Sequence, residues 1–104
     1  MRVFHDYRGA AIRLTDERMA HILRHPEMTG LEAAIDRALT HPETVVESLS
    51  DPLVRLYYRP FLGPPRGARF LCVVVRDSDH DAFVLTAYLT DRVKRGVPLW
   101  PRNT

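Results

Sequence analysis

Residues 29–49 read TGLEAAIDRALTHPETVVESL, and within this stretch the hydrophobic pattern changes from helical to strand periodicity. Before Pro42, apolar residues recur at the i, i+3, i+4, i+7 and i+8 positions of one buried helical stripe, namely Leu31, Ala34, Ile35, Ala38 and Leu39. Thr29 and Glu32 have the spacing of a capping box at its start. After Pro42 the period is two, which is typical of a strand. We therefore predict a helix over residues 29–40 that leads directly into a sheet.

A first helix is predicted upstream of this stretch. Thr15 is a suitable N-cap residue, and the acidic residues Asp16 and Glu17 lie in the first turn, where negative charge favours the helix dipole. Apolar residues then recur at helical spacing up to Pro26, which ends the helix because the residue before a proline is driven out of the α region. Residues 1–11 are mixed in character and are predicted as a short strand or an irregular lead-in.

Beyond the second helix the pattern predicts four strands, at 44–49, 54–59, 70–75 and 82–89, with turns or loops at 63–67 and 77–81. The last segment, 91–104, is predicted as an irregular tail, since Gly96 and Pro98 disfavour regular structure. Trp100 is predicted to anchor this tail to the body of the protein.

The order of these elements predicts the fold class. Short connections between strands imply antiparallel neighbours. We therefore predict an α+β fold in which two N-terminal helices pack on a four-stranded antiparallel meander sheet. The core is predicted to contain Leu31, Ile35, Leu39, Val73 and Leu85. The length of 104 residues predicts a single domain, 1–104, with its core at about 12–90 and the tail at 91–104.

Composition narrows the class of protein. Hydrophobic residues make up 45% and charged residues 27% of the chain, which fits a globular domain rather than a disordered one. No run approaches the roughly 18–20 apolar residues that a membrane span needs. The first residues show no secretory signal, so we expect a cytoplasmic protein without a membrane partner. Cys72 is the only cysteine, which rules out an internal disulfide and a multi-cysteine zinc site.

Arginine dominates the basic residues. The formal net charge is +2, and among the 15 basic residues only Lys94 is a lysine. Arginine binds phosphate and carboxylate groups well because its guanidinium donates two parallel hydrogen bonds. A GC-rich genome favours arginine codons and explains the same bias, so both interpretations stay open.

His21, Arg24 and His25 have the i, i+3, i+4 spacing that places three side chains on one helical face. A histidine transfers protons near neutral pH, and an arginine neutralises charge that develops on a phosphate. This combination is typical of a phosphodiesterase that uses no metal. The alternative is a solvated helix face. A zinc site is disfavoured, because two histidines lack a convincing third ligand.

Two sets of strand residues complete the candidate site. Thr86 and Tyr88 share one face of the last predicted strand and would present hydroxyl groups to a phosphate or stack on a base. Arg55, Tyr57 and Arg59 alternate along another strand, and arginine interleaved with tyrosine suits an RNA surface. The alternative is an ordinary solvent-facing side of the sheet.

The sequence HILRHPE at 21–27, the HPE at 41–43 before a strand, and the final strand FVLTAY at 83–88 resemble small nuclease-like domains. These domains belong to the barnase, EndoU, colicin and RelE-type fold group, in particular to its phage-associated members. The resemblance extends over roughly residues 12–100. It implies a metal-independent ribonuclease, as a toxin or a phage effector, with no cofactor.

The resemblance also implies roles for individual residues. His25 and Arg24 match the helical position of the group's active site, and Thr86 and Tyr88 match its strand position. His21 and Arg59 are added from geometry. In the implied reaction, an RNA 2′-hydroxyl attacks its own phosphate: a histidine transfers the proton, the arginines stabilise the phosphorane, and the strand hydroxyls position the phosphate.

This mechanism requires that the helix end with Arg24 and His25 lie beside Thr86 and Tyr88, with Arg59 at the rim. If the two sets lie apart, a non-catalytic RNA- or protein-binding module is the alternative. The expected partners are RNA, an acidic antitoxin or immunity protein, and a second copy of the chain in a homodimer.

Overall fold

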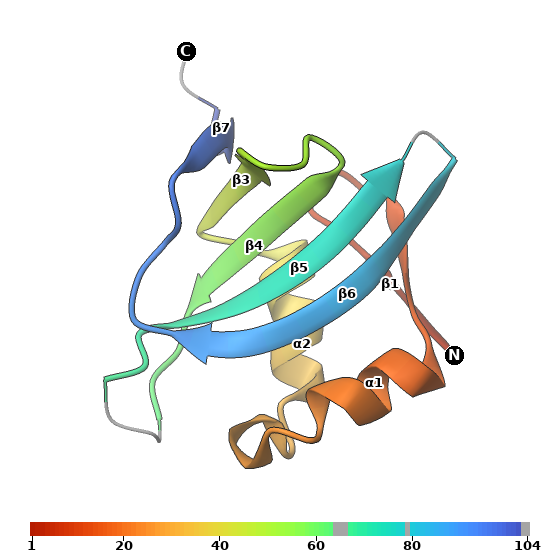
Figure 1. Ribbon diagram of the computed structural model, residues 1–104, viewed down its shortest axis with the longest axis vertical. Coiled ribbons are helices and arrows are strands. Elements are labelled where there is room, and N and C mark those ends of the chain that lie inside the picture. Colours follow the sequence, from red (N-terminus) through yellow and green to blue (C-terminus); the bar gives the residue numbers. More distant parts are fainter. Residues whose placement is uncertain (64–66, 79, 103–104) are drawn as a thin grey trace.

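The computed structural model describes residues 1–63, 67–78 and 80–102, and Figure 1 shows their path. The elements in chain order are β1 (Arg2–His5), β2 (Ala11–Leu14), α1 (Asp16–Ile22), the short 3₁₀ helix η1 (Pro26–Met28), α2 (Glu32–Thr40), β3 (Thr44–Ser48), β4 (Val54–Pro60), β5 (Phe70–Ser78), β6 (Asp81–Thr90) and β7 (Gly96–Trp100). Parts of the predicted loop at 63–67, of the turn at 77–81 and of the tail fall on residues 64–66, 79 and 103–104, which lie outside the described residues.

The sheet is larger than the sequence predicts and is mixed rather than antiparallel. In the described parts of the chain, seven strands lie in the order β1-β2-β6-β5-β4-β3-β7. The four predicted strands are present as the neighbours β3 to β6, but β1 and β2 form a hairpin that precedes the helices. Strand β2 pairs in parallel with β6 through Arg13 and Phe83. The prediction of a four-stranded antiparallel meander behind two N-terminal helices is therefore wrong, although the α+β character is correct.

Strand β7 occupies the segment that the sequence predicts as an irregular tail. It pairs antiparallel with β3, with Pro98 opposite Val46, and lies at one end of the sheet. An edge strand tolerates proline because one side of its backbone needs no hydrogen-bonded neighbour. Pro98 thus excludes a central strand but does not exclude β7.

The helices cover one face of the sheet, as Figure 1 shows, and the main core lies between the helices and the sheet. Its fully buried side chains come from both layers and include Ile12, Ile22, Ile35, Leu39, Val45, Tyr57, Val73 and Val84. A second, smaller cluster lies on the opposite face and contains Val46, Leu56, Tyr58 and Cys72, with Phe70, Val74, Tyr88 and Val93 packed against it. Among the described residues, no helix combines the length and the apolar composition needed to cross a membrane.

The helix boundaries differ from the prediction at two of their four ends, the C-terminus of α1 and the N-terminus of α2. Thr15 caps α1 as predicted, since its side chain accepts from the N–H of Arg18 at 3.1 Å. Helix α2 begins only at Glu32 and has no side-chain cap, so the predicted capping box from Thr29 is not formed. Gly30 has φ +80°, a left-handed conformation that interrupts the helical path there.

A register shift between β5 and β6 changes which side chains of β6 face the core. The irregularity lies between Val74 and Val75 and leaves Leu85 without a partner in the pairing. Val84 and Ala87 therefore both belong to the main core, while Leu85 is only partly buried. Strict alternation predicted Leu85 in the core, and this prediction is wrong.

Candidate functional site

The predicted helix-end residues His21, Arg24 and His25 are exposed, but they do not share a helical face. Helix α1 ends at Ile22. The N–H of Arg24 donates to the carbonyl of His21 at 3.2 Å, which closes a tight turn rather than a helical repeat. His25 directly precedes Pro26 and is extended, as residues before proline prefer. The prediction of three side chains on one helical face is therefore wrong.

Thr86 and Tyr88 lie on the face of the sheet that points away from the helices. Tyr88 packs in the second cluster, whereas its neighbour Ala87 belongs to the main core. Burial raises the pKa of Tyr88, whose hydroxyl interacts with the thiol of Cys72. Because α1 buries Ile22 in the main core, the helix-end residues and the two strand residues belong to opposite sides of the sheet. The structure does not bring the two halves of the predicted site together.

The third predicted set follows strand β4. Arg55, Tyr57 and Arg59 point to the helix side of the sheet, where Tyr57 is fully buried and the two arginines are partly exposed. The Tyr57 hydroxyl donates to Oδ2 of Asp6 at 2.7 Å. Burial, together with this hydrogen bond, raises the pKa of Tyr57. The prediction that Tyr57 lies on an open binding face is wrong, since the side chain is buried and packs against Tyr7.

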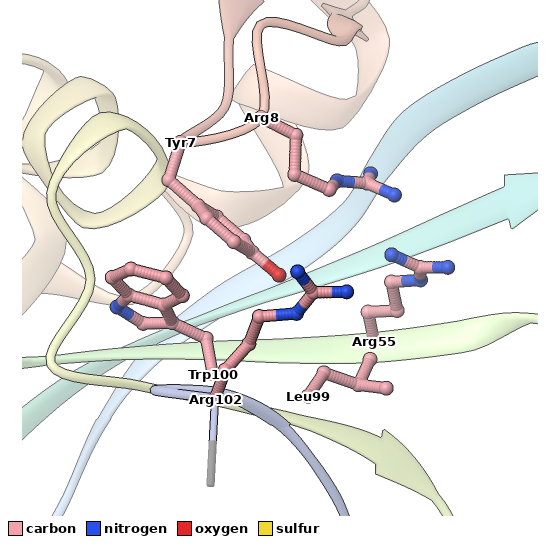
Figure 2. A pocket seen from close by; sticks show the side chains of 6 residues that line it. All are labelled: Tyr7, Arg8, Arg55, Leu99, Trp100 and Arg102. Atoms are coloured by element: carbon pink, nitrogen blue, oxygen red, sulfur yellow. The ribbon is translucent and has the colours of Figure 1, made fainter. Parts of the chain in front are cut away.

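The carboxylate of Asp6 organises the turn between β1 and β2. Its Oδ1 accepts from the N–H groups of Arg8 and Ala10, at 2.9 and 3.0 Å. Its Oδ2 accepts from Nε of Arg8 at 2.9 Å. Gly9 has φ +86°, which closes the turn at a position where other residues are strained. Tyr7 projects from this turn toward β4 and β7 (Figure 2), whereas Arg8 reaches Asp77 on β5.

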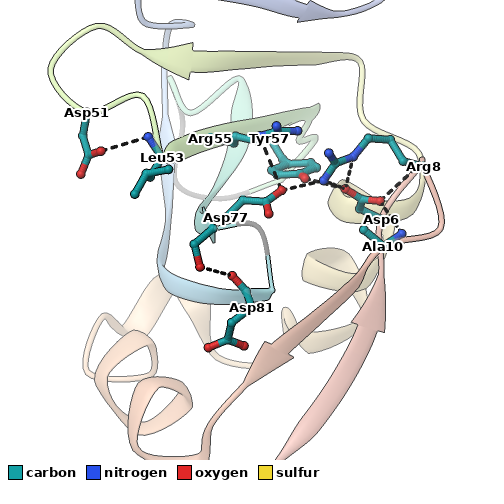
Figure 3. Close-up of polar contacts among 10 residues, drawn as sticks. Asp6, Arg8, Ala10, Asp51, Leu53, Arg55, Tyr57, Asp77 and Asp81 are labelled. Atoms are coloured by element: carbon teal, nitrogen blue, oxygen red, sulfur yellow. Dashed lines mark hydrogen bonds and ion pairs between the residues drawn. The ribbon is translucent and has the colours of Figure 1, made fainter.

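A network of charges connects this turn to the sheet (Figure 3). Nη2 of Arg8 lies 2.8 Å from Asp6 and donates to Oδ2 of Asp77 at 2.7 Å. Nε of Arg55 lies 3.6 Å from the same oxygen of Asp77, which is too far for a hydrogen bond. Within the part of the chain that the structure describes, this buried nitrogen has no hydrogen-bond partner.

The network fixes the charges that face the site. Burial alone would raise the pKa of Asp6, but hydrogen bonds from Tyr57, Arg8 and backbone N–H groups hold it below its ordinary value. Burial alone would lower the pKa of Arg8, but hydrogen bonds to Asp77 and Asp6 raise it. The carboxylate and the guanidinium are therefore both ionised at neutral pH.

Two aromatic side chains form the centre of the site. The rings of Tyr7 and Trp100 have centroids 5.1 Å apart and are tilted by 39°. Tyr7 also meets Tyr57 edge-on at 6.1 Å, and its N–H donates to the carbonyl of Leu39 at 2.9 Å. Trp100 retains 36% exposure at the end of β7. The turn, helix α2 and the last strand thus hold one aromatic pair that remains partly open to solvent.

Two adjoining hollows share Tyr7 and Trp100. The first has a volume of about 460 Å³ and is lined by these two residues with Arg8, Arg55, Leu99 and Arg102 (Figure 2); we call it the three-arginine hollow. The second has a volume of about 570 Å³ and is lined by the same pair with Thr40, His41, Pro42 and Arg59; we call it the Arg59 hollow. Together they form the Tyr7–Trp100 groove.

The electrostatics of the groove favour an anionic ligand. Four arginines line it, and the carboxylates of Asp6 and Asp77 lie behind only one end. Nη1 of Arg59 donates to the carbonyl of His41 at 2.7 Å, which holds this guanidinium at the opposite end. Aromatic rings flanked by guanidinium groups bind molecules that combine a flat ring with a negative charge. Within residues 1–63, 67–78 and 80–102, no three histidine, cysteine or acidic side chains come together to hold a metal ion.

Sequence reasoning identified Arg55 and Arg59 but missed Tyr7, Arg8, Trp100 and Arg102 as site residues. The available signal was an aromatic residue followed within two positions by arginine, in YR at 7–8 and in WPR at 100–102. Both pairs lie near the ends of the chain, where no regular element was predicted with a defined partner. Their proximity to β4 follows only from the β1–β2 hairpin and from β7.

Comparisons of the chain with protein-family models, with curated protein sequences and with solved structures found no match.

Proposed function

We propose that this protein binds single-stranded RNA along the Tyr7–Trp100 groove. The observation that carries this proposal is the partly exposed aromatic pair, which stands between two hollows that are both lined by arginine. Proteins bind single strands by stacking bases on aromatic side chains and by contacting phosphates with basic ones. The groove offers both kinds of contact within one surface.

The same arrangement favours a single strand over a duplex. Bases in a duplex are stacked on one another and are not free to stack on Tyr7 and Trp100. Arg55 and Arg59 stand four residues apart on one strand, so their Cα atoms are separated by about 13 Å. This spacing leaves room for an unpaired base at the aromatic pair between two phosphate contacts.

Binding without cleavage is the form of the proposal that the geometry supports best. The ribonuclease hypothesis relies on His21, Arg24 and His25 acting with Thr86 and Tyr88, and these residues face opposite sides of the sheet. An acidic antitoxin-like protein and a second copy of the chain remain predicted partners, and a cytoplasmic location remains part of this proposal.

The test is a titration with a 12-nucleotide single-stranded RNA of mixed sequence. Binding is measured by the quenching of the fluorescence of Trp100, the only tryptophan in the chain. Base stacking on an aromatic side chain contributes about 1–3 kcal/mol, so Trp100→Ala is expected to weaken binding roughly 5- to 150-fold, measured with labelled RNA. Trp100→Phe keeps a stacking ring and is expected to retain most of the affinity. Far-UV circular dichroism verifies that each variant is folded.

A matched charge control is available on α1. Arg59→Ala removes one guanidinium from the groove, whereas Arg18→Ala removes one from an exposed position on the helix. Only Arg59→Ala is expected to weaken binding. With about two phosphates contacted, the logarithm of the binding constant is expected to fall with a slope of about −1.4 against the logarithm of salt concentration. Equal effects of the two substitutions would reject the groove as the binding surface.

Cleavage is followed in the same samples by gel electrophoresis of the RNA. We expect intact RNA after incubation with the wild-type protein. Cleavage that His25→Ala lowers by about 100-fold or more would instead establish the ribonuclease, since this is the typical contribution of a general acid or base.

A further inference from the structure

The two ends of the Tyr7–Trp100 groove differ in the number of guanidinium groups that line them. The three-arginine hollow is lined by Arg8, Arg55 and Arg102, whereas the Arg59 hollow contains a single arginine. Figure 2 shows the three guanidinium groups turned toward one space, with the hydroxyl of Tyr7 beside them. Because Asp6 and Asp77 lie behind Arg8 and Arg55, the two ends differ in the number of nitrogen donors rather than in net charge, and a group with several acceptor oxygens fits the three-arginine hollow best.

The three guanidinium groups are held in different ways. Arg8 is fixed by Asp6 and Asp77, so its direction is set before a ligand binds. Nε of Arg55 is buried, lies 3.6 Å from Asp77 and has no hydrogen-bond partner among the described residues. Arg102 is exposed, and the ion pairs found in the described parts of the chain do not include it. Arg102 therefore retains its capacity to bind an anion, and the partly exposed guanidinium of Arg55 is held only loosely by Asp77.

Tyr7 adds a neutral donor to the same space. Burial raises the pKa of its hydroxyl, and the nearby charges of Arg8, Arg55 and Arg102 only partly oppose this effect. The hydroxyl therefore keeps its proton at neutral pH and donates a hydrogen bond.

From these observations we propose that the three-arginine hollow binds the terminal phosphate monoester of an RNA strand, an inference that rests on the proposed RNA-binding function. A terminal monoester carries about −1.5 to −2 charges at pH 7 and three acceptor oxygens, which match several guanidinium donors and one phenol. The base beside it stacks on Tyr7 and Trp100, and the following diester contacts Arg59. A 5′-phosphate and a 3′-phosphate share this chemistry, and the experiment distinguishes them.

The test compares three six-nucleotide RNAs of one sequence by isothermal titration calorimetry: one with a 5′-phosphate, one with a 3′-phosphate and one with neither. Hydrogen bonds to charged groups contribute about 1.5–3 kcal/mol, so one phosphorylated RNA is expected to bind at least about tenfold more tightly than the unphosphorylated RNA. If all three bind with the same affinity, RNA binding stands and the terminal-phosphate inference is overturned. If none binds, the proposed function itself fails.

Two substitutions test whether the preference for phosphorylated RNA arises in the three-arginine hollow. Arg102→Gln is expected to weaken the preferred phosphorylated RNA more than the unphosphorylated RNA, so that the ratio of their affinities falls toward one, because the guanidinium contacts the doubly charged terminal phosphate directly. Arg59→Gln, the matched control at the other end, is expected to weaken all three RNAs by the same factor. A preference that survives Arg102→Gln at its full size would overturn the assignment.

Discussion

Replacement of Asp6 by alanine is expected to destabilise the protein by about 3 kcal/mol. The carboxylate is 4% exposed and accepts hydrogen bonds from the Tyr57 hydroxyl, from Nε of Arg8 and from two backbone N–H groups. The Tyr57 hydroxyl is fully buried and would lose its acceptor, which costs about 1–3 kcal/mol. Arg8 would lose its buried partner, but it keeps Asp77 and is partly exposed, so the cost stays below the upper end of about 5 kcal/mol for a broken buried ion pair.

The pH dependence of Asp6→Asn tests the same reasoning. Hydrogen bonding in the folded state lowers the pKa of Asp6 below its ordinary value of 3.8, against the effect of burial. A carboxyl group with a lowered folded pKa stabilises the protein above its unfolded pKa, and this contribution is lost as the pH falls through the folded pKa. The free energy of unfolding of the wild-type protein is therefore expected to exceed that of Asp6→Asn by about 1–2 kcal/mol at pH 7. The difference is expected to be smaller at pH 3.

The free energies of unfolding of the wild type, Asp6→Ala and Asp6→Asn are measured by urea denaturation, with circular dichroism as the signal. For a domain of this size, 3 kcal/mol corresponds to a fall of roughly 12 °C in the melting temperature. Asp91→Ala is the matched control, because this exposed aspartate has only a 3.4 Å contact with Arg92 and is expected to change stability by less than about 0.5 kcal/mol. A cost of less than 1 kcal/mol for Asp6→Ala, or a stability difference for Asp6→Asn that grows toward low pH, would refute the reasoning.

Two further predictions concern β7 and the second cluster. Gly96→Ala would place a Cβ atom 2.5 Å from the carbonyl oxygen of Glu47, so we expect the substitution to displace β7 from β3. The fluorescence spectrum of Trp100 is then expected to shift and the affinity for RNA to fall. An unchanged spectrum would contradict this prediction. Cys72 is fully buried, and burial raises the pKa of its thiol to about 11. Alkylation of the folded protein by iodoacetamide at pH 8 is therefore expected to be about 100-fold or more slower than alkylation of the protein unfolded in urea. Equal rates with and without urea would show that the thiol is accessible.

Periodicity predicts local structure well where an element is long. Helix α2 and strands β3 to β6 lie close to the predicted ranges, because their apolar residues recur over two or more turns or several alternations. The strands β1 and β2 contain four residues each, which is too short for a clear pattern. Their hairpin is indicated only by Asp6 and Gly9 in the turn. The parallel pairing of β2 with β6 depends on contacts across most of the chain, and no local pattern encodes it.

In the candidate site, too, local patterns were predictable from the sequence and long-range contacts were not. Alternation along β4 correctly placed Arg55 and Arg59 on one face, but it does not tell whether that face is covered. The β1–β2 turn covers the middle of it, so Tyr57 is buried beneath Tyr7. Whether residues near the two ends of the chain reach β4 is decided by tertiary packing, which is why Trp100 was predicted as an anchor rather than as a binding residue.

The aromatic pair also joins the beginning of the chain to its end. Tyr7 is among the first residues and Trp100 among the last, so the binding surface is complete only when β7 has paired with β3. Closing so large a loop is entropically costly, and an edge strand opens more easily than a central one. Because a ligand that contacts Trp100 or Arg102 binds only the docked form, mass action makes it stabilise the β3–β7 pairing. Occupancy of the groove and closure of the chain upon itself are therefore linked equilibria, and slower amide exchange in β7 would report both at once.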